Sequence, residues 1–324
     1  MERDVTFDIM KGIGILAVIA GHSAGSLTYI DALSWKLIYS FHMPMFFIIA
    51  GYFYKENHDI LQKLKGDFKR LIIPYITTSI AFLIYQILTN ADFNSTYKYL
   101  IIAVIWGTGE SHTSEIWPNM PHIGAIWFLL ALFWSRTFFN IIITHTKRSY
   151  IIVIIIAIIA TITDRYIINL PFGILPGLSA MTFYIIGYSF KKFNINQYII
   201  LLCAICWLIH LFYSRIDMCI CLYKYYPVDV LGTTFGAILA YIISKQISLW
   251  NFSRYITRLG QVSLIVLCFH SLENNIINYN SIPVIQNNWF LIFVIRSFFC
   301  ISLTLLWNTF ANYAKLIKSK IFNI

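Results

Sequence analysis

Long apolar runs recur along the whole chain, and they limit its fold more than any other feature. A helix needs about 20 predominantly apolar residues to cross the hydrocarbon core of a bilayer. Ten runs approach that length, at residues 9–28, 37–54, 71–89, 122–143, 150–168, 174–190, 198–214, 228–244, 260–280 and 289–312. No internal repeat and no linker rich in Ser, Gly or Pro divides the chain. We therefore expect an all-α, polytopic membrane protein of about ten transmembrane helices, forming a single domain over residues 1–324.

The composition excludes the other broad classes. Of the 324 residues, 59% are hydrophobic and only 12% are charged, against about 25% charged in soluble domains. The formal net charge of +10 comes from basic residues between the apolar runs, where they set orientation and meet anionic lipid headgroups. No nucleic-acid-binding motif occurs, so we expect no nucleic-acid partner. The pair Cys203 and Cys206 lies inside an apolar run with no second ligand pair, which favours packing and predicts no metal site.

The basic residues also predict the orientation of the chain. Cytoplasmic loops carry an excess of Lys and Arg, and the most basic connection joins the second and third runs. Further clusters lie at 147–148, 191–192, 245–258 and 315–320. All of them face one side if the short apolar piece 97–106 does not cross the membrane. We therefore expect both termini in the cytoplasm and residues 90–121 outside, as a segment that is either re-entrant or an interfacial loop with an amphipathic helix.

The first run places a cation and a histidine on one helix face. Lys11 and His22 are 11 positions apart, which is about 1100° of rotation and within about 20° of three full turns. Their axial separation is about 16 Å, so Lys11 lies near the cytoplasmic surface and His22 well toward the outer leaflet. A histidine within a membrane needs a partner or a hydrated cavity, and an imidazole can accept a proton from a hydroxyl near neutral pH. His22 is therefore a candidate general base; a buried histidine that bonds a neighbouring helix is the alternative.

Four short motifs in the first 135 residues form a pattern. Lys11 begins the sequence Lys-Gly-x-Gly, and ten residues separate Lys11 from His22. Residues 41–53 place Phe-Phe before a small residue and Gly. Residues 69–75 run from basic residues to a proline, and residues 126–129 read Ile-Trp-Phe-Leu. In combination these motifs resemble those of the acyltransferase family 3 membrane proteins, and the fucose 4-O-acetylase-like branch most.

Two positions depart from the family pattern. The basic residue of the first helix is most often Arg in the family and is Lys11 here. Lysine keeps the charge but lacks the bidentate fork that binds phosphate. The small residue before Gly in the second motif is usually Ser and is Ala50 here, which removes one polar contact.

The resemblance implies transfer of an acyl group, usually acetyl, from coenzyme A to a hydroxyl of a sugar or cell-surface glycan. It makes His22 the catalytic residue, with acetyl-CoA as co-substrate. Coenzyme A is a cytoplasmic polyanion, and Lys11, Lys69 and Arg70 offer cations at that face. An extended pantetheine arm can bridge the distance from Lys11 to His22, where an acceptor would enter from outside. We therefore expect a multi-pass protein of the inner (cytoplasmic) membrane.

Five further residues are candidates for substrate binding. His42 lies at the level of His22, His122 and Trp127 begin the run 122–143, and His270 and Glu273 share a helix face. An indole such as that of Trp127 can stack on a sugar or belong to the interfacial aromatic belt. His270 and Glu273 can equally form a structural polar pair. Other ionic residues within the runs, Arg136 and Arg296 among them, are expected to pair with carboxylates.

A transporter or lipid-linked sugar flippase is the alternative function. It would explain the spans, the interrupted segment 90–121 and the buried histidines. Transporters often carry matching broken helices in two halves, whereas the sequence shows one interruption and no similarity between its halves. The identity of the acceptor, and a succinyl or longer acyl group in place of acetyl, stay open at this point.

Overall fold

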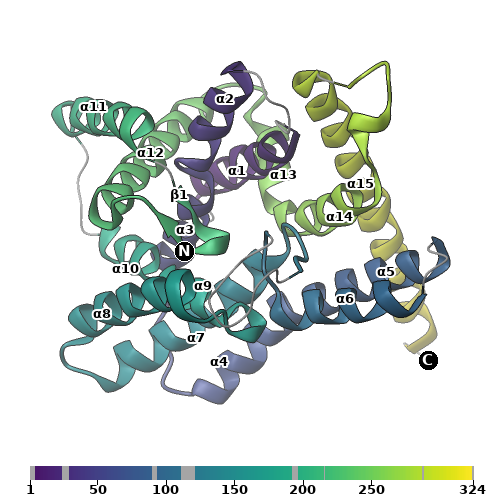
Figure 1. Cartoon of the computed structure of the whole chain (residues 1–324), viewed down its shortest axis with the longest axis horizontal. Coiled ribbons are helices and arrows are strands. Elements are labelled where there is room, and N and C mark those ends of the chain that lie inside the picture. The colour runs from purple at the N-terminus through teal and green to yellow at the C-terminus, as the bar shows by residue number, and fades with distance from the viewer. Residues whose placement is uncertain are drawn as a thin grey trace.

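The computed structural model describes residues 4–23, 29–89, 93–110, 121–191, 196–214, 216–286 and 288–322. Almost all of these residues are helical (Figure 1). The α-helices are α1 (Val5–Ser23), α2 (Tyr29–Tyr39), α3 (His42–Tyr52), α4 (Ile60–Asp67), α5 (Ile73–Thr89), α6 (Phe93–Trp106), α7 (Trp127–His145), α8 (Ser149–Ile162), α9 (Ile174–Ser179), α10 (Met181–Phe190), α11 (Gln197–Tyr213), α12 (Tyr226–Ile247), α13 (Ser253–Gln261), α14 (Ser263–Ile276) and α15 (Trp289–Phe322).

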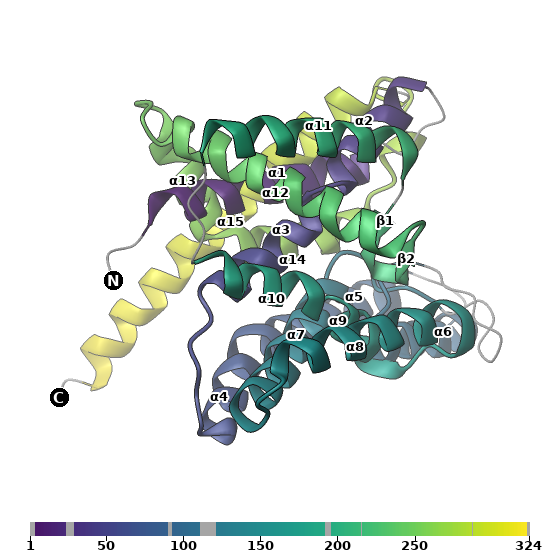
Figure 2. The same ribbon diagram turned by 90° about the vertical axis from the view of Figure 1, so that its left-hand side faces the viewer.

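Short elements complete the chain. The π-helical turns η1 (Phe68–Ile72) and η2 (Thr163–Ile167) continue α4 and α8, and the 3₁₀ turns are η3 (Pro171–Gly173), η4 (Met218–Ile220) and η5 (Tyr279–Ser281). The two-residue strands β1 (Ile216–Asp217) and β2 (Leu222–Tyr223) pair antiparallel around η4. The ends of the chain and α4 lie at one side of the molecule, and this hairpin lies at the opposite side (Figure 2).

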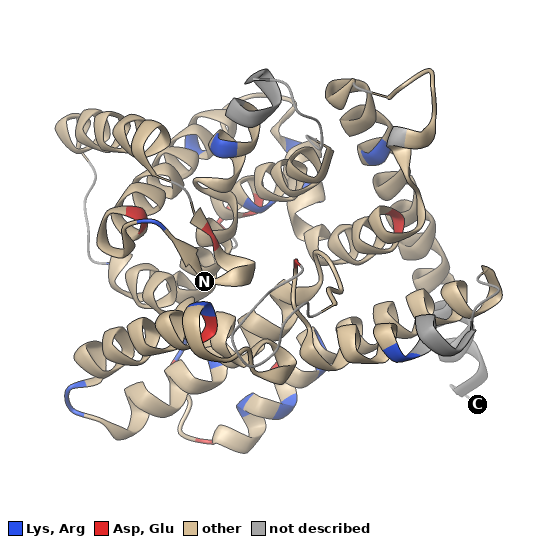
Figure 3. Ribbon diagram, in the orientation of Figure 1, with Lys and Arg blue, Asp and Glu red and all other residues tan. Residues whose placement is uncertain are grey.

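Among the described residues, six helices are long and apolar enough to cross a membrane. They are α1, the continuous helix Ile60–Thr89, α7, Ser149–Ile167, α12 and Trp289–Tyr313. Two bent pairs, η3–α9 with α10 (46°) and α13 with α14 (72°), raise the number to as many as eight. Few charged residues interrupt these helices (Figure 3), and side chains such as Ile151, Ile155 and Ile159 on α8 are half-exposed or more, as lipid-facing residues would be. The predicted all-α membrane class is confirmed at this level.

The structure divides some of the apolar runs. The run 37–54 is shared between α2 and α3, which break at Ser40 and Phe41. Pro44 explains the break, because it has no N–H to donate to the carbonyl of Ser40 and is tolerated only in the first turn of a new helix. The remaining α3 has 11 residues and α11 has 17. The count of ten spans, and the side on which each end lies, stay predictions.

Close crossings between backbones fix the helices that carry the candidate residues. A Cβ added at Gly51 of α3 would lie 1.9 Å from the carbonyl oxygen of Tyr184, and one at Gly187 of α10 would lie 2.0 Å from that of Ile48. The α1–α13 crossing is equally tight, because a Cβ at Gly260 would lie 1.7 Å from the carbonyl oxygen of Asp8. These contacts leave α1 and α3 little freedom to shift.

The segment after α5 returns into the interior. The hydroxyl of Tyr75, early in α5, donates to the carbonyl of Val104, late in α6, at 2.6 Å. The two helices therefore run antiparallel and side by side. Gly107 then turns with φ of +65° beside Leu130, and residues 109 and 110 reach a cavity described below. Within the outer segment expected over 90–121, residues 90–92 and 111–120 lie outside the described residues.

Candidate active site

Two cavities lie end to end along α1. The first, called here the basic cavity, has a volume of about 670 Å³, and its lining includes Lys11, Arg70 and Arg136. The second, called here the histidine cavity, has a volume of about 190 Å³ and contains His22. Val18 and Met43 line both cavities. The helix stripe predicted from Lys11 to His22 therefore runs from one cavity to the other.

Two of the three cations that line the basic cavity, Lys11 and Arg136, are held by buried carboxylates. Lys11 Nζ lies 2.6 Å from Asp8 Oδ1, and Gln261 Nε2 donates to the other oxygen of Asp8 at 3.4 Å. Arg136, on α7, donates from Nε to Asp67 Oδ1 at 2.9 Å, and its Nη2 lies 2.8 Å from the same oxygen. The expected carboxylate partner of Arg136 is thus confirmed.

The rest of the basic cavity is apolar. Its walls come from Ile15 on α1, Phe46 on α3, Phe128 on α7 and Leu267 on α14, among other residues. Lys69, expected to act with Arg70, is exposed and does not line this cavity. Arg136 lines it and was not a predicted binding residue. A cavity that combines three cations with apolar walls suits a ligand that has both anionic groups and an arm of low charge.

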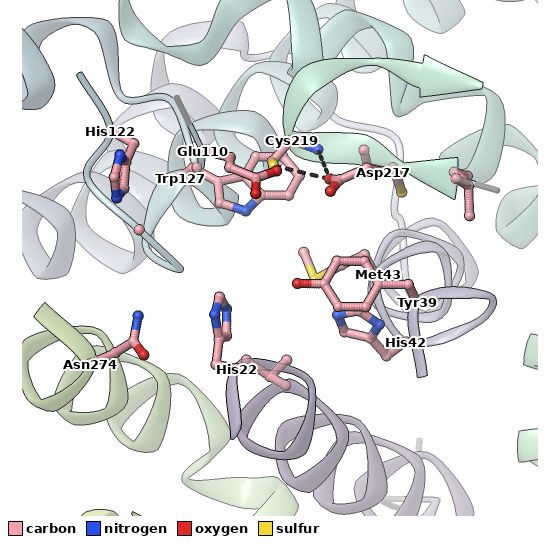
Figure 4. A pocket seen from close by; sticks show the side chains of 15 residues that line it. His22, Tyr39, His42, Met43, Glu110, His122, Trp127, Asp217, Cys219 and Asn274 are labelled. Carbon is pink, nitrogen blue, oxygen red and sulfur yellow. Dashed lines mark hydrogen bonds between the residues drawn. The ribbon is translucent and has the colours of Figure 1, made fainter. Parts of the chain in front are cut away.

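The histidine cavity gathers side chains from distant parts of the sequence (Figure 4). His22 and Asn274 lie on one wall, from α1 and α14, and Glu110, Trp127 and the β1–η4 segment lie across from them. Most of the substrate-binding candidates named from the sequence meet here. Those lining the cavity with His22 are His42, His122 and Trp127.

The tautomer of His42 follows from its contact with the backbone. Its Nδ1 lies 2.7 Å from the carbonyl oxygen of Ile38. A carbonyl oxygen can only accept, so Nδ1 carries the proton and Nε2 of the neutral ring is an acceptor. His42 therefore presents a fixed orientation beside His22.

His270 and Glu273 lie behind His22, and they are not among the residues that line the cavity. The His270 ring centroid is 5.2 Å from that of His22, and His270 Nδ1 is 3.3 Å from Glu273 Oε2. Arg296 Nε is 3.5 Å from Glu273 Oε1, and Arg296 Nη1 donates to Asn274 Oδ1 at 2.6 Å. The expected pairing of Arg296 with a carboxylate is confirmed, and the arrangement favours the polar-pair interpretation of His270 and Glu273.

Two carboxylates line the histidine cavity although no sequence pattern predicted them as site residues. Asp217 Oδ1 accepts from the backbone N–H of Cys219 at 3.2 Å and from its thiol at 3.0 Å. Single oxygens of Glu110 and Asp217 and the sulfur of Cys219 all lie within 4.8 Å of one another. Burial and the Asp217 carboxylate raise the pKa of the Cys219 thiol well above its ordinary value. The thiol is therefore a neutral hydrogen-bond donor near pH 7 and not a nucleophile.

Comparison with known proteins agrees with this geometry. The family model of the acyltransferase domain, acyltransferase family 3, matches residues 4–307. The chain belongs to acyltransferase family 3. It is 30% identical over 155 residues to the nodulation protein NolL of Mesorhizobium japonicum, which is 46% of this chain and 38% of that protein. It is 43% identical over 57 residues to NolL of Sinorhizobium fredii, 16% of each chain.

The chain therefore spans well under half the length of these curated relatives. No solved structure matches it. The chain is thus a member of this family that has, among the described residues, at least six helices long and apolar enough to cross a membrane.

Proposed function

We propose that this protein transfers an acetyl group from cytoplasmic acetyl-CoA to a hydroxyl of a sugar or cell-surface glycan on the outer side of the inner membrane. The observation that carries the proposal is the pair of neighbouring cavities along α1, which share Val18 and Met43 in their linings. One cavity offers cations and apolar walls, and the other offers imidazoles and an indole. A donor and an acceptor can thus meet beside His22 without sharing a binding site.

The basic cavity holds the donor in this proposal. The phosphates contact Lys11, Arg70 and Arg136, and the pantetheine arm follows the apolar walls along α1. The axial distance from Lys11 to His22, about 16 Å, is then covered by the arm, so that the thioester lies beside His22. Lys69, exposed at the surface, contributes only to the potential that attracts the polyanion.

His22 acts as the general base. A neutral imidazole accepts the proton of the acceptor hydroxyl while the hydroxyl oxygen attacks the thioester carbonyl carbon. The carbon–sulfur bond breaks, and the coenzyme A thiolate leaves and takes up the proton from the imidazolium. A route through a transient acetyl on His22 uses the same contacts and has the same balance.

The histidine cavity suits a short acyl group and one sugar ring. Its volume of about 190 Å³ leaves little room for a long acyl chain beside an acceptor. Trp127 stacks on the sugar, and His42 and His122 contact its hydroxyls. His270 and Glu273 hold His22 from behind and do not themselves contact the acceptor.

The orientation follows from the same arrangement. The chain ends and α4 share one side of the molecule (Figure 2). The densest cluster of basic residues, Lys63, Lys65, Lys69 and Arg70, lies in α4 and η1. Placing this side in the cytoplasm satisfies the positive-inside rule. The predicted topology, with both termini inside and about ten spans, places the histidine cavity toward the outer side.

The experiment that tests the function replaces His22. In nanodiscs, His22→Gln should bind coenzyme A as the wild type does but transfer acetyl at least about 10²-fold more slowly, because glutamine cannot accept the proton. Transfer is measured as labelled acetyl on a panel of methyl glycosides and as free thiol released. The matched control, His145→Gln, removes an exposed histidine at the end of α7 and should leave transfer unchanged.

Two results would contradict the proposal. Transfer at the wild-type rate by a folded His22→Gln protein would remove His22 from the chemistry. Absence of acetyl-CoA turnover by the purified wild type, together with glycan movement across vesicles that is lost in His22→Gln, would make the protein a transporter.

A further inference from the structure

The ionic residues that line the two cavities have opposite signs. The ionic residues that line the basic cavity are Lys11, Arg70 and Arg136. The ionic residues that line the histidine cavity, within the part of the chain that the structure describes, are Glu110 and Asp217. The acceptor side of the proposed reaction is thus acidic, although the protein as a whole has a net charge of +10.

The two carboxylates converge on the cavity from different elements. Glu110 follows α6 and is exposed, whereas Asp217 of β1 is only 5% exposed. Their nearest carboxylate oxygens lie within 4.8 Å of each other, on the wall across from His22 (Figure 4). One oxygen of Asp217 is fixed by the N–H and thiol of Cys219. Asp217 therefore has a defined position across from the candidate base, and the Glu110 carboxylate lies beside it.

An indole completes the same wall. A Cβ added at Gly109 would lie 2.3 Å from Trp127 Cδ1 and 2.7 Å from the Cβ of Cys219. Only a glycine lets the backbone pass between the indole and the η4 turn, and it places Glu110 next to both. Trp127 itself is 7% exposed and lines the cavity.

Carboxylates beside an aromatic side chain suit a sugar ring, which has both hydroxyl groups and an apolar C–H face. Ionised carboxylates only accept hydrogen bonds, and they accept strong ones from hydroxyl groups. The aromatic face packs against the apolar C–H groups of the ring. Two converging carboxylates also repel any ligand that brings a third negative charge into a small cavity.

We propose that Glu110 and Asp217 select an uncharged sugar ring as the acceptor and exclude sugars that carry a carboxylate, phosphate or sulfate. The pair accepts hydrogen bonds from ring hydroxyls while Trp127 packs against the ring, which directs another hydroxyl across the cavity to His22. This inference rests on the proposed acetyl transfer to a carbohydrate, and it adds the charge class of the acceptor.

The test compares sugars that differ only in charge. Paired methyl glycosides, glucose with glucuronic acid and galactose with galacturonic acid, are titrated against His22→Gln protein in nanodiscs, with binding read by saturation-transfer NMR and competition. The His22→Gln protein is used because it should bind the glycosides without acetylating them. In the pair that binds best, the neutral glycoside should bind at least about 100-fold more tightly than the acid, because the acid places a third negative charge beside two carboxylates.

The carboxylates are then neutralised without change of shape. Glu110→Gln with Asp217→Asn should weaken binding of the neutral glycoside and reduce its preference over the acid by at least about tenfold. If the double variant does not fold, Glu110→Gln alone, at an exposed position, should reduce the preference in the same direction. Glu56→Gln, an exposed carboxylate in the loop after α3, is the matched control and should keep the preference.

Each other outcome overturns the inference. These outcomes are equal binding of the neutral and acidic members, a preference that survives loss of both carboxylates, and no glycoside binding at all. Binding of methyl glucosaminide at least about tenfold tighter than methyl glucoside would show that the carboxylates serve an ammonium group. A different result would refute the proposed acetyl transfer and leave the selection by charge intact. In that result, neutral glycosides bind with the expected preference, but the wild-type protein acetylates none of them.

Discussion

Replacing Lys11 by alanine should weaken coenzyme A binding through two effects that the structure separates. Lys11 Nζ lies 2.6 Å from Asp8 Oδ1, and Asp8 is only 3% exposed. The substitution removes a cation from the donor phosphates. It also leaves the Asp8 carboxylate without that cation, at the end of the cavity where the phosphates lie in the proposed reaction.

The two effects have comparable size. Loss of a charge-assisted hydrogen bond costs about 1.5–3 kcal/mol. A phosphate that contacted Lys11 would lie about 5 Å from the Asp8 carboxylate, and at an effective dielectric constant of about 20 this repulsion is about 3 kcal/mol as an upper limit. Lys11→Ala should therefore weaken binding about 10²- to 10³-fold. Lys11→Ala with Asp8→Asn removes the repulsion and should bind at least about tenfold more tightly than Lys11→Ala alone.

Isothermal titration of coenzyme A into nanodisc-embedded protein, at one fixed ionic strength, measures both differences. Lys98→Ala, at an exposed position on α6 outside the basic cavity, is the matched control and should bind as the wild type does. Unchanged affinity in Lys11→Ala would refute the placement of the donor. A double variant no tighter than Lys11→Ala would refute the role assigned to Asp8.

Three further predictions follow from the fold. Gly51→Ala should lower the unfolding midpoint by the equivalent of about 1–3 kcal/mol or more, because the added Cβ would overlap the backbone. The control Gly66→Ala, with nothing within 4 Å of the added Cβ, should raise the midpoint slightly, and equal midpoints of the two variants in thermal scans would refute the tight crossing. Val18→Phe should block acetyl transfer while coenzyme A still binds, since Val18 lines both cavities; unchanged transfer would refute the connection. In a cysteine-free background, a cysteine at Ser281 should react with an impermeant maleimide in spheroplasts and one at Lys63 should not, and the reverse pattern would invert the topology.

The sequence predicted those features of the site that depend on the geometry of a single helix. The alignment of Lys11 with His22 depends only on the helical repeat, and both cavities follow that stripe. The spacing of His270 and Glu273 allowed either a structural polar pair or a substrate-binding role, and the two side chains lie 3.3 Å apart as a pair. Their position behind His22, outside the cavity lining, depends on the rotation of α14 against α1, which no local pattern encodes.

Residues joined only by tertiary contacts were not predictable. Arg136, Glu110 and Asp217 reach their cavities through packing of elements far apart in sequence, and neither carboxylate belongs to any periodic pattern. Lys69 and Arg70 were treated alike because they are adjacent. Successive helical residues differ by about 100° in direction, so only one of the two lines the cavity.

Hydropathy counts apolar runs and is insensitive to breaks within them. The run 37–54 looked continuous because Pro44 is flanked by apolar residues, yet it is divided between α2 and α3. That break matters for the site. It turns the chain at the level of His22, so that Tyr39, His42 and Met43 all line the histidine cavity.

The opposite signs of the ionic residues that line the two cavities give a physical reason why acetyl would cross while neither substrate does. In the proposed reaction a polyanionic donor is attracted by Lys11 and Arg136 and repelled by Glu110 and Asp217, so its phosphates stay in the basic cavity. An uncharged sugar gains no ionic contact from the basic cavity and is held on the acidic side by hydroxyl contacts. The cavities share Val18 and Met43 in their linings, and in the proposed reaction only the thin arm of the donor passes between these side chains. A transporter would need a path wide enough for the whole sugar, whereas an acyltransferase needs only the reach of its donor.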